Sequence, residues 1–343
     1  MKKRKKHRKR KPLSGWLCAI VAGLFLAVGF EEGAFTLDIP DITIVDEVPD
    51  RTESVVDTGE SIQKDFSEEA VSSESEKTDS EDTAFSDMEV HFIDVGQGDA
   101  TLIISDGHYM LIDAGDNSKG TTVQLYLTKL GVEKLDYLIL THTDADHIGG
   151  ADVIVNKFDI DTIFMGDYKK ENKTYEELID AIEYKYMKYS VPEVGSEYQL
   201  GNAVFTILAP NDTYSDPNNS SIALLLKNGD DVFLFSGDCE EKAEADILAN
   251  GIDIDCDVYQ VGHHGSNTSS SKDFLDAMTP DYAVISCEEG NSYRHPHAET
   301  LNNLRAMDVK VFRTDEQGSI IAYSNGSGIT WNCAPSESWK AGE

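Results

Sequence analysis

Positive charge is scarce in this sequence outside its first eleven residues. Nine of the 29 lysines and arginines lie in residues 2–11, while 63 aspartates and glutamates give the chain a net charge of −34. Residues 88–343 hold 17 basic and 44 acidic residues, a net charge of −27. A general nucleic-acid-binding protein needs a basic face to displace counterions from phosphates, so the composition argues against that class. A local site that handles phosphates through metal ions remains compatible with it.

Cysteine is also rare, with five in 343 residues and no C-x-x-C pair. A zinc site built from thiolates is therefore not expected. Cys239, Cys256, Cys287 and Cys333 lie far apart in the sequence, and both disulfides and buried free thiols stay open for them. The Gly-Gln-Gly-Asp segment at 96–99 lacks the lysine and the spacing of a phosphate-binding P-loop.

The sequence has only one long apolar run, residues 12–30, and this run contains no charged residue. This run is long enough to cross a bilayer as a helix. We interpret it as a signal anchor, with the basic tail 1–11 in the cytoplasm and the rest of the chain outside the cell. The segment Ala27-Val28-Gly29 fits the alternative of a cleaved signal peptide, which would give a secreted protein. Either interpretation places residues 31–343 outside the cytoplasm.

Residues 31–87 form an acidic segment rich in serine and threonine, with 19 acidic and three basic residues. Its scattered apolar residues cannot bury enough surface to offset the entropy lost on ordering. We therefore predict a disordered linker between the membrane helix and a folded domain that spans residues 88–343.

Within residues 88–343, short apolar runs typical of strands alternate with amphipathic helical patterns. Strands are predicted at 88–95, 100–105, 109–115, 136–142, 203–210, 221–227, 231–238, 257–264, 281–287, 310–314 and 318–324. Helices are predicted at 121–131, 174–189, 240–250, 271–278 and 297–307. Two strand-rich halves, each flanked by helices, predict an α/β domain with two sheets packed face to face and helices outside, a four-layer αββα sandwich.

The segment THTDADHIGG at 141–150 concentrates four potential metal ligands, His142, Asp144, Asp146 and His147, after an apolar strand. In an extended stretch His142 and Asp144 point the same way, and a tight turn would bring the other two nearby. The glycines that follow permit a close backbone turn into a helix. Imidazole and carboxylate ligands suit zinc, iron or manganese. The structural alternative is a polar loop in which Asp144 or Asp146 caps a helix.

This segment resembles the H-x-[HD]-x-D-H signature of the metallo-β-lactamase superfamily. Further segments resemble the hydrolase domain of ComEC-type competence proteins: HFIDVGQGDATLI (91–103), MLIDAG (110–115), SGD (236–238), VGHHGSNTSS (261–270) and the Tyr-Arg-His-Pro run (293–296). The resemblance covers most of residues 88–325 and implies a metal-dependent hydrolase. It does not extend to a many-helix membrane channel, because the chain has one apolar span.

The resemblance implies a site for two divalent ions with the ligands His142, Asp144, Asp146, His147, Asp238 and His264. Asp238 would bridge the ions, and His264 is preferred to His263 as the last ligand. The superfamily's usual further histidine is absent, because no histidine lies between His147 and His263. Residues 218–221, Asn-Asn-Ser-Ser, lie where the resemblance would lead one to expect that histidine. The first ion would then be weakly held by oxygen-rich ligands, which favours manganese or loosely bound zinc, with a single ion as the alternative.

Other residues are expected to act around these ligands. Asp146 and His295 are predicted to be catalytic, His295 as a general acid or charge stabiliser. Asp113, in the LIDAG segment, is expected to orient a ligand rather than to bind metal. Substrate binding or support of the ligands is predicted for Asp99, Asp113, Asn219, Ser220, His263 and Ser266.

The predicted reaction is attack of a metal-bound hydroxide on an ester, with a phosphodiester as the leading candidate. The protein would thus be a membrane-anchored extracytoplasmic phosphodiesterase or nuclease. DNA is one candidate substrate, although the charge of −27 argues for a smaller phosphate ester. The alternatives are a non-catalytic surface accessory that retains the fold, and a hydrolase of other esters or β-lactams.

Overall fold

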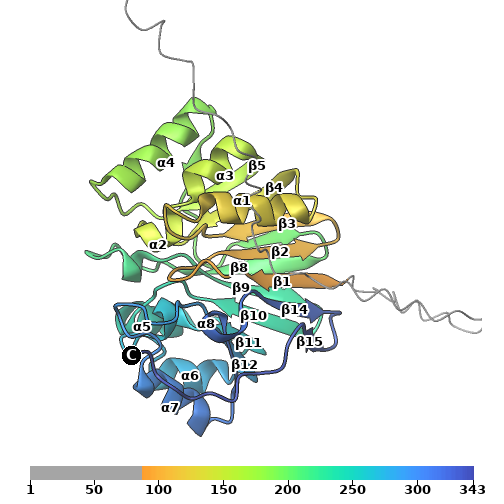
Figure 1. The fold of residues 1–343 in the computed structure, drawn as a ribbon, viewed down its shortest axis with the longest axis vertical. Helices are drawn as coiled ribbons and strands as arrows, with labels where there is room; N and C mark the ends of the chain where they lie inside the picture. The colour runs from red at the N-terminus through yellow and green to blue at the C-terminus, as the bar shows by residue number, and fades with distance from the viewer. Residues whose placement is uncertain (1–86) are drawn as a thin grey trace, which may run out of the picture. The chain divides into compact units, whose positions relative to one another are not determined.

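The computed structural model describes residues 87–343, which form two β-sheets packed face to face with helices on both outer sides (Figure 1). The first sheet has the strand order β15-β14-β1-β2-β3-β4-β5-β6, and the second has the order β13-β12-β11-β10-β9-β8-β7. This arrangement confirms the predicted two-sheet α/β sandwich.

The first sheet contains β1 (Met88–Phe92), β2 (Thr101–Ser105), β3 (His108–Ile112), β4 (Lys134–Leu140), β5 (Asp159–Met165), β6 (Tyr189–Ser190), β14 (Ile320–Ser324) and β15 (Ile329–Trp331). The second contains β7 (Glu197–Leu200), β8 (Ala203–Ala209), β9 (Ala223–Asn228), β10 (Asp231–Phe235), β11 (Val258–Gln260), β12 (Tyr282–Ile285) and β13 (Lys310–Arg313). The helices are α1 (Gly120–Lys129), α2 (Ala145–Ile148), α3 (Ala151–Lys157), α4 (Lys173–Tyr184), α5 (Glu241–Ala249), α6 (Lys272–Met278), α7 (Ala298–Ala306) and α8 (Thr314–Gln317), with 3₁₀ turns η1 (Asn218–Ser220) and η2 (Gly262–Gly265).

The two halves of the domain follow a similar plan. Each starts with antiparallel strands and continues with parallel ones: β3, β4, β5 and β6 in the first sheet, and β10, β11, β12 and β13 in the second. Strand β14 then returns to the first sheet and pairs antiparallel with β1, from Met88 opposite Ser324 to Phe92 opposite Ile320. The last part of the chain therefore completes the sheet that the first part begins.

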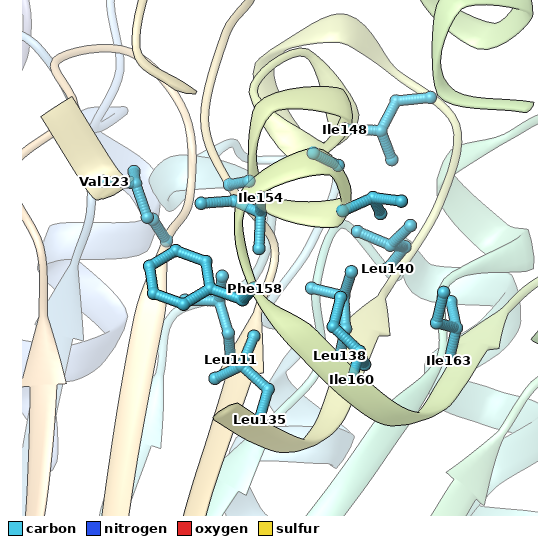
Figure 2. Close-up of a cluster of buried hydrophobic side chains, with 14 of the residues drawn as sticks. Leu111, Val123, Leu135, Leu138, Leu140, Ile148, Ile154, Phe158, Ile160 and Ile163 are labelled. Carbon is cyan, nitrogen blue, oxygen red and sulfur yellow. The ribbon is translucent and has the colours of Figure 1, made fainter. Parts of the chain in front are cut away.

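Three apolar layers hold the four structural layers together. One lies between the sheets, where the rings of Phe92 and Phe235 stack with centroids 6.3 Å apart. A second joins the first sheet to α1, α3 and α4, and Figure 2 shows part of it around Leu138 and Phe158. The third joins the second sheet to α5, α6 and α7. Strand β4 is apolar on both faces because Leu138 points to the helices and Ile139 to the other sheet.

Every strand and helix predicted within residues 88–343 overlaps an element of the same type, but some boundaries differ. The helix predicted at 174–189 ends at Tyr184, because Tyr186 has a positive φ of 55° and Tyr189–Ser190 pairs with β5. Strand β5 itself was not predicted. It begins with alternating acidic residues, Asp159 and Asp161, whose side chains stay exposed or half-exposed at the start of the strand.

The predicted basic tail, membrane helix and acidic linker lie in residues 1–86, outside the described part of the chain. Between residues 87 and 343, no helix is both long and apolar enough to cross a membrane.

Candidate metal centre

Buried polar side chains meet where several strands end at one edge of the two sheets. They are Asp99, Asp113, His142, His147, Asp238 and His264. Asp113 follows β3, His142 and His147 follow β4, Asp238 follows β10, and His264 follows β11. Because the carboxyl ends of parallel strands open at one edge, the topology gathers residues that lie up to 165 positions apart in the sequence.

Asp113, which follows β3, fixes the start of the segment that follows β4. The backbone N–H of Thr141 donates to Oδ1 of Asp113 at 2.8 Å, and its hydroxyl donates to Oδ2 at 2.6 Å. The chain then forms the single turn of α2. Asp144 stands at the N-terminus of this turn but makes no side-chain capping hydrogen bond, and instead its Oδ1 lies 2.6 Å from Nζ of Lys170. Capping by Asp144, the structural alternative, is therefore wrong.

The glycines around this segment are needed for close packing. Gly149 and Gly150 have ordinary negative φ angles of −60° and −89°. A Cβ on Gly149 would lie 2.2 Å from the backbone nitrogen of Asn117, and one on Gly150 would lie 2.3 Å from the carbonyl oxygen of Ala114. The prediction of a tight glycine segment holds, but its reason is contact with a neighbouring loop rather than an unusual backbone angle.

One ligand atom from each of Asp99, His147, Asp238 and His264 lies within 4.8 Å of the others, and all four side chains are buried. Nε2 of His147 lies 3.3 Å from both Nε2 of His264 and Oδ1 of Asp238. Two nitrogens that bind one tetrahedral ion at about 2.0–2.1 Å lie about 3.4 Å apart, so this spacing fits a shared metal ion.

Unpaired buried atoms support the same interpretation. Oδ1 of Asp238 and Nε2 of His142 are buried, and neither has a hydrogen-bond partner among residues 87–343. A buried polar atom without a partner is costly, and a divalent cation would supply one to each. The donor set of imidazoles and carboxylates therefore fits a divalent metal ion.

The electrostatics of the centre depend on Asp238. Burial alone would raise the pKa of Asp238, but the rings of His147 and His264 hold it well below its usual value. Burial likewise opposes charge on His264, yet Asp238 and then Asp146 raise its pKa to about 9. By contrast, burial lowers the pKa of His142 to about 3, and the neighbouring His147 adds to this effect. The carboxylate of Asp238 is therefore ionised and attracts positive charge.

The other predicted ligands surround the same carboxylate. Nε2 of His142 and Nε2 of His264 each lie 3.7 Å from Oδ2 of Asp238. Oδ2 of Asp146 lies 3.3 Å from Nε2 of His264. Asp144 lines the same pocket, although its ion pair with Lys170 engages one of its oxygens. The structure thus gathers all six predicted ligands around one centre.

Two aspartates contact the histidine rings from behind. Oδ2 of Asp113 lies 2.7 Å from Nδ1 of His147, which leaves Nε2 directed at Asp238. Oδ2 of Asp99 lies 4.0 Å from the Nδ1 atoms of both His147 and His264, on the far side of each ring from Nε2. By distance, Asp99 therefore belongs to the group of four potential ligands. Its position behind the rings of His147 and His264 is better suited to orienting them.

The two consecutive histidines His263 and His264 both have left-handed backbone angles, with φ of 51° and 55°. Nδ1 of His264 lies 3.0 Å from the carbonyl oxygen of Ser286 and donates to it, which directs Nε2 at the carboxylates of Asp146 and Asp238. His263 is partly exposed and its Nδ1 contacts the hydroxyl of Thr268 at 3.1 Å. Ser266 contacts Thr268 at 3.0 Å and so reaches His263 indirectly.

Residues 218–221 make hydrogen bonds that hold their own turn in place. Oδ1 of Asn219 accepts from the backbone N–H of Ala243 at 3.0 Å, and the hydroxyl of Ser220 donates to the carbonyl of Asp216 at 2.8 Å. These bonds hold η1 in place, and substrate contact by the two side chains stays a prediction. The hydroxyl of Ser221, which the sequence marked only as part of the segment 218–221, lies 3.3 Å from Nδ1 of His142.

A pocket of about 80 Å³ opens at the centre. Its lining residues are Gln97, Asp144, Asp146, Asn218, Asp238, His263, His264, Tyr293 and His295. His295 is buried there, and burial together with the nearby His264 lowers its pKa to about 3. Gln97, Asn218 and Tyr293 lie in segments that the resemblance marked, but the sequence assigned none of the three a role in the site.

A larger but more open depression, of about 500 Å³, lies at the opposite ends of β4 and β5. Its polar groups include His108 and Asp136, which pair at 2.9 Å. Among residues 87–343, the group of potential metal ligands lies at the other edge, with Asp238. The pocket beside Asp238 is therefore the candidate active site.

Residues 93–288 match the family model of the metallo-beta-lactamase superfamily, and the chain belongs to that superfamily of metal-dependent hydrolases. Among its relatives, ComE operon protein 3 of Bacillus subtilis (strain 168) is 31% identical over 257 residues, which cover 68% of this chain and 33% of the relative. Competence protein ComA of Neisseria gonorrhoeae is 33% identical over 230 residues, covering 66% of this chain and 31% of that protein. Recombination protein 2 of Haemophilus influenzae is 32% identical over 238 residues, covering 68% and 28%.

The chain spans about a third of the length of these relatives. The resemblance to ComEC-type competence proteins is confirmed, and so is the family.

Proposed function

We propose that this chain is a metal-dependent phosphodiesterase or nuclease that acts outside the cytoplasm. The observation that carries the proposal is the buried carboxylate of Asp238, which lies between the imidazoles of His142, His147 and His264 at 3.3–3.7 Å. Such a concentrated set of ligands at the open edge of a sandwich suits hydrolysis at a metal centre.

The proposed ligands are His142, Asp144, Asp146, His147, Asp238 and His264, which would hold one or two divalent ions of zinc or manganese. A divalent ion held there lowers the pKa of a water molecule and stabilises negative charge on the attacking and leaving oxygens. Asp113 and Asp99 would orient the rings of His147 and His264 from behind.

Two residues would serve the reaction directly. Burial would raise the pKa of Asp146, but the rings of His264 and His147 hold it below its usual value, so this carboxylate is ionised. His295 lines the pocket as a neutral ring, since its pKa is lowered to about 3. A neutral imidazole can donate its N–H to a developing negative charge, which supports the role of charge stabiliser over that of general acid.

A phosphodiester is the preferred substrate class for two reasons. The named relatives include two competence-operon or competence proteins and a recombination protein, which supports a substrate related to DNA. In addition, no histidine lies between His147 and His263 to supply the further imidazole expected in a β-lactamase, which argues against β-lactams. The charge of −27 on residues 88–343 limits affinity for long polyanions and leaves smaller phosphate esters as candidates.

For the cellular location we propose a single-pass anchor at residues 12–30, a linker at 31–87 and a hydrolase domain at 88–343 outside the cytoplasm. The competence relatives are consistent with association with a membrane. Protease added to intact cells should then degrade the domain, whereas full protection of the domain would contradict the external placement.

The full-length chain tests the proposed activity when metal content and turnover are measured in parallel. Zinc and manganese are each supplied, with bis(p-nitrophenyl) phosphate, single-stranded DNA and a chromogenic β-lactam as substrates. We expect hydrolysis of the phosphodiesters and loss of both metal and turnover in the Asp146→Ala/His147→Ala variant. Wild-type phosphodiesterase rates in this variant would show that the ligands are wrongly assigned.

One observation favours a second candidate, a non-catalytic surface protein that retains the fold. Asp144, a proposed ligand, is engaged by Lys170 at 2.6 Å. Stoichiometric metal binding without turnover on any of the three substrates would support this candidate.

A further inference from the structure

Tyr293 is an exposed aromatic side chain at the mouth of the pocket. Its side chain is 61% exposed. The ring lines the pocket and stacks on the ring of His295, with centroids 5.6 Å apart and planes 22° from parallel. His295 holds the tyrosine ring from one side, and the side that faces away from His295 is available to a second planar group.

Gln97 lies in the same pocket with an amide group that lacks partners. Both its Nε2 and Oε1 atoms are buried, and neither makes a hydrogen bond within residues 87–343. The loop around it is fixed, since the backbone N–H of Asp99 donates to the carbonyl of Asp146 at 3.1 Å. An unpaired buried amide is costly, so a ligand in the pocket would gain by supplying the missing hydrogen bond.

We propose that Tyr293 and Gln97 form a nucleotide-binding subsite beside the metal centre. Tyr293 stacks on the base next to the scissile phosphate, and the amide of Gln97 donates to an oxygen of that phosphate. The proposal rests on the phosphodiesterase function and specifies its substrate as a nucleotide or nucleic acid strand. Base stacking is strong and tolerant of sequence because every base has an aromatic face.

This subsite also offers a way for an acidic domain to bind a negatively charged nucleotide. With 17 basic and 44 acidic residues in 88–343, the domain has few cations to offer to a polyanion. Stacking on Tyr293 and hydrogen bonding to Gln97 use neutral groups, which contribute affinity without positive charge. A short contact of one or two nucleotides around the metal centre is therefore compatible with the charge of the chain.

The subsite is tested by binding, with the full-length chain saturated with zinc and calorimetric titration of two ligands. Thymidine 5′-monophosphate carries the base, and 2-deoxyribose 5-phosphate lacks it. The wild-type chain should bind the nucleotide about 5- to 150-fold more tightly than the sugar phosphate, as expected for one stacked base. The Tyr293→Leu variant should lose this difference and bind the sugar phosphate as the wild type does, while Tyr293→Phe should keep it.

Gln97 gives an independent result in the same titrations. Because its amide contacts the phosphate, Gln97→Ala should weaken the binding of both ligands by the same factor, about 2- to 12-fold. Equal binding of the two ligands by the wild type, no binding of the nucleotide, or an equal loss for both ligands in Tyr293→Leu would each overturn the subsite. Thermal melting of each variant shows whether it is folded.

The outcome is separate from that of the proposed function. Hydrolysis of bis(p-nitrophenyl) phosphate without discrimination between the two ligands would leave the phosphodiesterase standing and remove the nucleotide subsite. Discrimination between the ligands without hydrolysis would support the subsite and contradict the proposed activity.

Discussion

Nδ1 of His147 lies 2.7 Å from Oδ2 of Asp113, and both side chains are buried. The same carboxylate accepts hydrogen bonds from the backbone and the hydroxyl of Thr141. One aspartate at the end of β3 therefore fixes both the start of the segment after β4 and the orientation of a proposed ligand within it.

Replacing Asp113 with asparagine should weaken metal binding. An amide oxygen can accept only part of these hydrogen bonds, and its nitrogen would oppose one of the donors, so the ring of His147 loses its fixed orientation. Removal of such a partner typically lowers metal affinity by about 10- to 100-fold. Competition with a chelator measures the affinity for zinc and manganese.

The control is Asp106→Asn, at an exposed turn that precedes β3. It should leave the metal affinity unchanged. If Asp113→Asn bound zinc as tightly as the wild type, the role of Asp113 in orienting His147 would be refuted.

Gly98→Ala should destabilise the domain more than a comparable glycine substitution. Gly98 has φ of 137°, and a Cβ there would lie 2.3 Å from the carbonyl oxygen of Asp146. Gly107 also has a positive φ, 76°, but a Cβ there would meet no heavy atom of the structure within 4 Å. Gly107→Ala should cost about 1–2 kcal/mol from the left-handed backbone alone.

Gly98→Ala adds a steric clash to the backbone cost, so its loss in free energy of unfolding should exceed that of Gly107→Ala. It should also reduce metal affinity, because the loop rests on Asp146. Urea denaturation and metal titration of both variants check this. Equal losses of stability would show that the loop can move away from Asp146 without penalty.

Much of the centre was predictable because its residues are close together in the sequence. His142, Asp144, Asp146 and His147 lie within six positions, so local spacing alone indicates a metal site. Asp238 lies more than ninety positions away, and only the resemblance to a known family connected it with this segment. The apolar strand β4 was predictable since both of its faces are buried.

The remaining residues depend on how loops meet in three dimensions. Gln97, Ser221 and Tyr293 lie in segments that the resemblance marked, but the sequence gave them no role. They reach the centre because the sheets bring the ends of distant strands together. The glycine pair at 149–150 was predicted for a turn, whereas its role is to admit the loop that contains Asn117. Sequence spacing indicates which groups are present but not which backbone lies against them.

Glu244→Gln should change how stability depends on pH. Glu244 is fully buried on α5, and its oxygens accept from the backbone N–H groups of Ser270 and Ser271. Burial raises the pKa of Glu244 above its ordinary value of 4.5, although these hydrogen bonds oppose the shift. The folded state therefore keeps the proton at pH values where the unfolded chain has lost it.

The sign follows from proton linkage. Between pH 4.5 and the raised pKa, the folded state binds more protons than the unfolded state does. As the pH rises through this range, the contribution of Glu244 to the free energy of unfolding therefore falls by up to about 1.4 kcal/mol per pH unit. Glutamine lacks this loss, so the stability advantage of the wild type over Glu244→Gln should shrink as the pH rises. Urea unfolding at several pH values measures the difference, with Glu183→Gln on the exposed side of α4 as the control. A gap that widens with pH would contradict the raised pKa.

The described cysteines should behave as free thiols. Cys239, Cys256, Cys287 and Cys333 are all unpaired in residues 87–343, and the first three are buried. Burial raises the pKa of the Cys239 thiol well above its usual value, which suppresses the reactive thiolate. In a Cys18→Ser background, a thiol reagent should modify Cys333 first and the other three only on unfolding. Detection of a disulfide by mass spectrometry without reduction would contradict the structure.

Lys170→Ala should strengthen the binding of metal if Asp144 is a ligand. Nζ of Lys170 lies 2.6 Å from Oδ1 of Asp144, and both side chains are about a third exposed. A partly exposed ion pair contributes up to about 1 kcal/mol, so releasing the carboxylate should raise the affinity for the more weakly held ion by up to about fivefold. Manganese titration of the full-length chain measures this change.

The matched control is Lys173→Ala, three residues further along the chain. Lys173 pairs with Glu177 on the surface of α4 and is 84% exposed, so its removal takes away one positive charge without freeing Asp144. A gain in affinity in both variants would indicate a general effect of charge. If Lys170→Ala lowered the affinity for manganese and Lys173→Ala did not, Lys170 would help to assemble the centre. Its ion pair would then not keep Asp144 from binding the metal. An increase confined to Lys170→Ala is the result expected when Asp144 exchanges an ammonium group for a metal ion.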